Sequence, residues 1–138
     1  MRISGVAGGT SVETSGLVNT GFESPEPEVA LPLTLVEKLR LYPPPEGAVI
    51  YEYTAFGGVK VKVTLVPKSL WIQVVGKGSK RKVRATAAIS EAEDEVLISD
   101  NLASALGIVP EDPRRGMWRF RWEGLKKLRT SARPEHWR

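Results

Sequence analysis

The stretch from residue 16 to residue 41 sets the pattern of the chain. Residues 16–22 read GLVNTGF, and residues 28–41 read EVALPLTLVEKLRL. An apolar run ends in a small polar turn, a proline-rich acidic segment follows, and a second apolar run leads into residues with helical spacing. Pro32 suits the first turn of a helix, and the apolar residues after it share one face. We therefore predict a strand, a turn, a second strand and a short helix.

Paired glycines mark two further turns. Gly8-Gly9 and Gly57-Gly58 each separate two apolar runs, which predicts antiparallel hairpins. Residues 59–66 alternate apolar and polar side chains, the pattern of a half-buried strand, and Pro67 with Lys68 is expected to end that strand. A third hairpin is predicted from residues 70–75 and 82–89.

The predicted fold class is mainly β, closed and barrel-like, with about seven or eight strands and two short helices. The second helix covers residues 100–106, with Ser99 or Asp100 as N-cap and Gly107 as the C-terminal stop.

Composition excludes several classes of function. The chain has 138 residues, which favours one domain, and it has no cysteine, so disulfides, thiol nucleophiles and thiolate metal sites are excluded. The single histidine, His136, makes a serine–histidine–aspartate triad or a histidine-based metal site improbable, and no cofactor is expected. With no membrane span and no signal peptide evident, a cytoplasmic location is expected.

Charge divides the chain unevenly. Nine Lys/Arg and two Glu fall in residues 114–138, whereas acidic residues outnumber basic ones before residue 114. We predict a domain over residues 1–122 and a basic C-terminal tail over residues 123–138 that the fold does not require.

Scarce Asn and Gln, absent cysteine and many charged groups hint at a thermophile.

Three segments lie at residues 17–21, 51–61 and 97–99. In their order along the chain they resemble the retropepsin-like (retroviral-type) aspartic protease family, in a prokaryotic or archaeal form. The resemblance covers roughly residues 3–122. The first segment, at the position of the family's catalytic loop, is Leu17-Val18-Asn19-Thr20-Gly21. The second, at the position of the flap that closes over substrate, is the hairpin at residues 51–61, with Tyr53, Phe56, Gly57 and Gly58. The third precedes the C-terminal helix and is Leu97-Ile98-Ser99, with Ser99 where the family has glycine.

The resemblance implies a fold, a partner and a chemistry. It implies the acid-protease barrel with one lobe per chain, so a site must form between two copies in a homodimer. In the family, two carboxylates share one proton; one acts as general base on water and the other as acid toward the scissile carbonyl of a peptide. In the family, the hydroxyl at the position of Thr20 hydrogen-bonds across the dimer and fixes the two loops. Gly21 would allow close approach of the backbone.

The departure from the family pattern is Asn19, which stands at the catalytic aspartate position. An amide cannot take a proton from water near neutral pH, so the chain as written is expected to be inactive. A natural loss of catalysis and a deliberate replacement that traps an inactive form both account for Asn19.

Other interpretations are available for each motif. Asn19, Thr20 and Gly21 also suit an ordinary β-turn, and the glycine pair near Phe56 an ordinary hairpin tip. Residues 91–95 are acidic but lack the ligand order of a calcium loop, so a solvated loop is favoured over a cation site.

Residues 118–122 alternate aromatic and arginine side chains and precede the basic tail. This pattern supports an alternative hypothesis, a non-catalytic basic β-domain that binds nucleic acid or a protein partner. Strand alternation, with the aromatic side chains packed inward, explains the same pattern without nucleic acid and is favoured.

Overall fold

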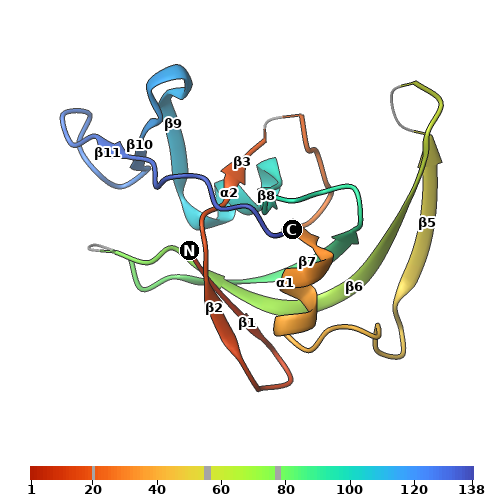
Figure 1. Ribbon diagram of the computed structural model, residues 1–138. Coiled ribbons are helices and arrows are strands. Elements are labelled where there is room, and N and C mark those ends of the chain that lie inside the picture. Colours follow the sequence, from red (N-terminus) through yellow and green to blue (C-terminus); the bar gives the residue numbers. More distant parts are fainter. Residues whose placement is uncertain (20, 55–56, 77–78) are drawn as a thin grey trace.

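The computed structural model describes residues 1–19, 21–54, 57–76 and 79–138. Most of the described strands belong to one strongly curved sheet (Figure 1). Its strands, in chain order, are β1 (Arg2–Gly5), β2 (Ser11–Glu13), β3 (Leu17–Val18), β4 (Glu28–Pro32), β5 (Val49–Thr54), β6 (Lys60–Gln73), β7 (Lys82–Ser90) and β8 (Leu97–Ile98).

The strands follow the order β2-β1-β6-β7-β4-β8-β3, and β5, which lies off this path, pairs with residues 60–65 of β6. The mainly β class is confirmed. The sheet curls into a half-barrel, and within the described ranges its end strands β2 and β3 do not pair with each other (Figure 1).

All three predicted hairpins form. β1 pairs antiparallel with β2, β5 with residues 60–65 of β6, and β7 with residues 63–66 and 70–73 of β6. The apolar run that follows Gly8-Gly9 forms two strands, because β2 ends at Glu13 and β3 begins at Leu17.

β6 differs from the prediction because it does not end at Pro67. It continues to Gln73 through a shift in its register with β7 between Val66 and Leu70. Lys68 adopts a positive φ of 48° there, and its N–H donates to Oγ1 of the buried Thr86 at 3.1 Å. A bulge thus carries the proline through the strand.

The two predicted helices are present as α1 (Leu33–Lys38) and α2 (Asp100–Leu106). Leu35 and Val36 of α1 and Leu102 and Leu106 of α2 are fully or almost fully buried. They pack with apolar side chains of β1, β4, β6, β7 and β8 in one core. This core anchors the strands that carry the predicted functional loop.

A second, smaller sheet follows α2 and has the order β11-β10-β9. It consists of β9 (Ile108–Asp112), β10 (Met117–Phe120) and β11 (Arg129–Thr130), with a short 3-10 helix, η1 (Pro113–Arg115), between β9 and β10. Part of the segment expected to be a basic tail is therefore a strand. The C-terminal segment then runs back to the main sheet, where Trp137 packs against the core (Figure 1).

Candidate functional site

Two short strands hold the loop that contains Asn19. β3 and β8 pair in parallel, with Leu17 beside Leu97 and Val18 beside Ile98. β8 also pairs with β4, so it lies between the two strands that enter and leave the loop. The N–H of Asn19 donates to the carbonyl oxygen of Ile98 at 3.2 Å. The first and third predicted segments, distant in sequence, thus form one structural unit.

The side chain of Asn19 closes a local turn. Its Oδ1 accepts the N–H of Gly21 at 3.0 Å, and its carbonyl oxygen accepts the N–H of Phe22 at 3.0 Å. A Cβ at Gly21 would lie only 3.3 Å from that Oδ1, which favours glycine. Asn19 is exposed, and the predicted site residue Thr20 lies outside the described residues. The two bonds are those of a β-turn, which local composition suits, with an Asx-type bond inside it, and β8 holds the loop in place.

Ser99 has a structural role in this unit. Its side chain is completely buried, and its Oγ accepts the N–H of Leu102 and the N–H of Glu28, each at 3.1 Å. The first bond caps α2, as predicted. The second bond joins the same oxygen to the start of β4. Ser99 therefore fixes the helix against the strand that follows the Asn19 loop.

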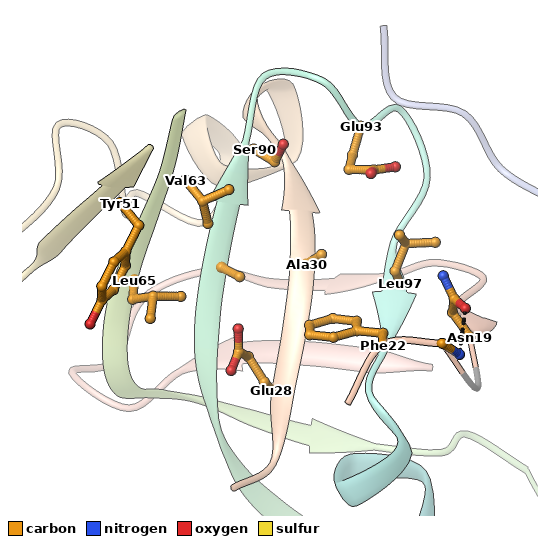
Figure 2. Close-up of a pocket in the computed structure, with 12 residues that line it drawn as sticks. Asn19, Phe22, Glu28, Ala30, Tyr51, Val63, Leu65, Ser90, Glu93 and Leu97 are labelled. Carbon is orange, nitrogen blue, oxygen red and sulfur yellow. Dashed lines mark hydrogen bonds between the residues drawn. The ribbon is translucent and has the colours of Figure 1, made fainter. Parts of the chain in front are cut away.

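A cavity of about 380 Å³ opens beside this loop (Figure 2). Of the predicted site residues, Asn19, Gly21 and Leu97 line it, whereas Ile98 is buried in the core. The other lining residues were not among the predicted site residues, although Tyr51 begins the predicted flap hairpin. They come from the loop and from β4, β5, β6, β7 and the segment before β8: Phe22, Glu28, Ala30, Tyr51, Val63, Leu65, Ala88, Ser90 and Glu93.

Two half-buried carboxyl groups line the cavity. Burial raises the pKa of Glu28, and the nearby Glu26 raises it further. Burial likewise raises the pKa of Glu93, with further contributions from Asp94 and Glu95. Both shifts follow from a low-dielectric setting in which the charged form is disfavoured.

The predicted flap residues are only partly placed. Gly57 and Gly58 are exposed with φ of 86° and 81°, the turn geometry that glycine favours. Phe56 and the side chain of Tyr53 lie outside the described residues. Tyr51, which precedes Tyr53 by two residues in β5, is the tyrosine that lines the cavity. The β5–β6 hairpin thus lines the cavity with strand residues, namely Tyr51, Val63 and Leu65.

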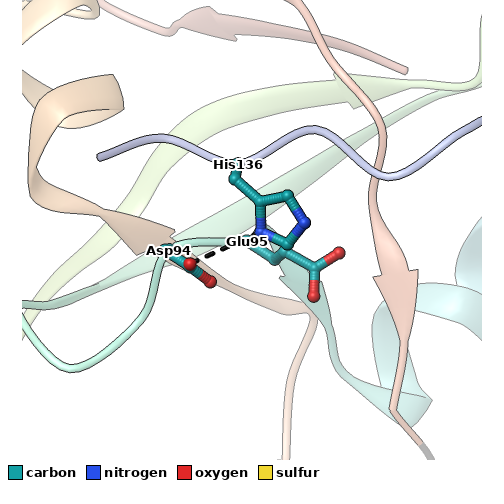
Figure 3. A group of neighbouring side chains, drawn as sticks. All are labelled: Asp94, Glu95 and His136. Carbon is teal, nitrogen blue, oxygen red and sulfur yellow. Dashed lines mark ion pairs between the residues drawn. The ribbon is translucent and has the colours of Figure 1, made fainter.

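The acidic loop at residues 91–95 is not uniformly solvated. Asp94 pairs with Nδ1 of His136 at 3.4 Å and Nε of Arg138 at 3.2 Å, and Glu95 lies beside them (Figure 3). The hydrogen bond from Arg138 lowers the pKa of Asp94, and that from His136 adds to the effect. These pairings explain the cluster as an attachment point for the C-terminus.

The aromatic and arginine side chains of β10 and its surroundings pack on one another. Phe120 is buried, stacks on Trp122 with ring centroids 4.8 Å apart, and meets Trp118 edge to face. Arg81 lies over Trp122, and Arg129 lies over Trp118 and Phe120. The inward packing favoured from the sequence is confirmed for Phe120. The nucleic-acid hypothesis is then supported only by the basic charge of this segment.

Comparison with known proteins gives no match to a protein-family model, a curated protein or a solved structure. Among the described residues, no helix has the length and apolar character needed to cross a membrane.

Proposed function

We propose that the chain is one protomer of a homodimeric, retropepsin-like aspartic endopeptidase scaffold, silent with Asn19 and hydrolytic when aspartate occupies that position. The observation that carries the proposal is the pairing of β3 with β8. It joins the two apolar motifs of the family resemblance and places Asn19 and Leu97 on one cavity.

Exposure of the loop supports the homodimer. Asn19 is exposed, Leu17 before it is 51% exposed, and β3 is an end strand of the sheet. A second copy placed about a twofold axis at this edge would bring two Asn19 side chains together and cover Leu17. Twofold pairing is also the commonest closed assembly.

The chemistry follows from the side chain at position 19. Two carboxylates at the axis would share one proton, because two close negative charges repel; the ionised member would take a proton from water, and the other would donate to the peptide carbonyl. The amide of Asn19 supplies no such base. In each protomer the cavity beside the loop and the β5–β6 hairpin would hold the peptide.

The test compares the Asn19→Asp chain with the unsubstituted chain on a mixed library of extended peptides from about pH 3 to pH 7, a range that spans ordinary and raised carboxyl pKa values. We expect cleavage only by Asn19→Asp, with a bell-shaped pH profile that belongs to the pair of carboxyls. Asn101→Asp, which adds the same group on α2, is the matched control and should cleave nothing. A folded, dimeric Asn19→Asp chain without activity across this range would refute the proposal.

A further inference from the structure

The cavity beside the Asn19 loop is acidic and has no cationic counterpart. Its lining contains Glu28 and Glu93, and no lysine, arginine or histidine among the described residues. The charged groups that shift the pKa of these two glutamates are themselves carboxyls: Glu26 for the first, Asp94 and Glu95 for the second. The described residues show no ion pair to either glutamate.

The backbone of Glu28 is held rigidly. Its N–H donates to Oγ of Ser99, its carbonyl oxygen accepts the N–H of Ser99 at 3.1 Å, and it stands in register with Thr86 of β7. Its carboxyl group therefore projects from a fixed strand position. In the view of Figure 2, Ala30 lies between Glu28 and Glu93, and Glu93 belongs to the loop that leads to β8.

Such an arrangement costs free energy. A half-buried carboxylate loses part of its hydration, and the described residues give it no cationic partner. A ligand with a positive charge would therefore offset the lost hydration free energy by pairing with the carboxylate. The rest of the lining is largely apolar, including Phe22, Tyr51 and Leu65. The cavity volume of about 380 Å³ lies within the range of small-molecule pockets. A largely apolar cavity with carboxyl groups in its lining matches a side chain made of a hydrocarbon stem and a cationic head.

We propose that this cavity is a specificity pocket for a basic residue of an extended peptide, with the carboxylate of Glu28 as the principal acceptor for the cationic head and Glu93 adding negative charge. The proposal rests on the proposed function, because it assigns the cavity to the peptide-binding cleft. The methylene stem of the lysine or arginine would lie along the apolar lining. The pocket would reject acidic side chains by repulsion.

The test measures binding to the unsubstituted chain, in which Asn19 prevents turnover. The probes are two eight-residue capped peptides, one with lysine and one with norleucine at the same central position, and the assay is fluorescence anisotropy at low salt. We expect the lysine peptide to bind about tenfold more tightly, the scale of one charge-assisted hydrogen bond.

Glu28→Gln should bring the ratio of the two affinities close to one, and Glu93→Gln should lower it less. Glu91→Gln is the matched control, because it removes the same charge from an exposed position on the acidic loop and should leave the ratio unchanged. If Glu28→Gln does not give a cooperative melt, Glu28→Asp replaces it, since it keeps the charge but withdraws the acceptor from the pocket.

The outcomes separate the two proposals. A lysine preference that Glu28→Gln removes supports the pocket, even if Asn19→Asp hydrolyses nothing and the protease proposal falls. Equal binding of the two peptides, no detectable binding of the lysine peptide, or a preference that survives both cavity substitutions overturns the pocket. It does so whether or not Asn19→Asp cleaves peptides.

Discussion

Trp137, near the C-terminus, should stabilise the fold even though it lies in a segment whose sequence indicates a dispensable tail. Its Nε1 donates to Oγ1 of the buried Thr14 at 2.9 Å, and its backbone N–H donates to the carbonyl oxygen of Asp94 at 2.6 Å. The ring packs against the core, and Nζ of Lys38 lies 5.0 Å from its centroid. We therefore expect Trp137→Ala to destabilise the protein substantially.

The magnitude can be assembled from these contacts. Trp137 is mostly covered, and after allowance for the surface already covered in a compact unfolded chain its burial on folding is roughly 100 Å², worth about 2.5 kcal/mol. The side-chain hydrogen bond adds about 1 kcal/mol, and the cation–π contact adds about 0.5 kcal/mol. Release of the side chain returns about 1 kcal/mol of conformational entropy. The net loss in the free energy of unfolding is about 3 kcal/mol.

For a chain of this size, that loss lowers Tm by about 10 °C. The measurement is thermal and urea unfolding at one fixed protein concentration, because any dimer makes Tm depend on concentration. Leu125→Ala is the control: Leu125 is 76% exposed, and its loss should change the free energy by less than about 0.5 kcal/mol. A loss below about 1 kcal/mol for Trp137→Ala would show that the C-terminal segment is not docked as described.

Three further changes test other parts of the fold. Gly107→Ala should cost more than about 2 kcal/mol in urea unfolding, because φ is 77° and the new Cβ would overlap the ring of Trp122. Ser99→Ala should cost about 1–3 kcal/mol, since one buried and one partly buried N–H donor lose their acceptor, and a smaller loss would show that water replaces it. Glu123 has its pKa lowered to about 2, chiefly by its hydrogen bond from Arg129. Glu123→Gln should therefore lower Tm above about pH 4.3, the unfolded-state pKa, and the difference should vanish as pH falls through about 2. A Tm difference that does not depend on pH would refute the ionic origin.

Features with local causes were predictable from the sequence. The hairpins follow from glycine pairs between apolar runs, and α2 follows from a serine cap and a terminal glycine, all within a few residues of one another. Ser99 shows the limit of such reasoning. Its role as a cap is local, but its second bond, to the N–H of Glu28, depends on β8 lying beside β4.

The cavity was not predictable, because its lining depends on strand order. In the sequence Glu28 begins the second apolar run and Glu93 belongs to the acidic loop at residues 91–95, and only the fold places both on one cavity. Tyr51 and Tyr53 share one face of a strand by alternation, and the sequence does not say which part of the hairpin reaches the cavity. Trp137 lies among polar residues with no periodicity that would indicate its packing on the core.

The long strand β6 has different neighbours along its length, which predicts how its amides open to solvent. Residues 60–62 pair with β5, residues 63–65 pair with both β5 and β7, and residues 70–73 pair with both β1 and β7. The bulge interrupts the ladder between the last two zones. Hydrogen exchange should therefore be fastest at the hairpin end and slow in two separate blocks, with the bulge dividing one opening unit from the next. The hairpin end could then fluctuate while the body of the same strand stays closed.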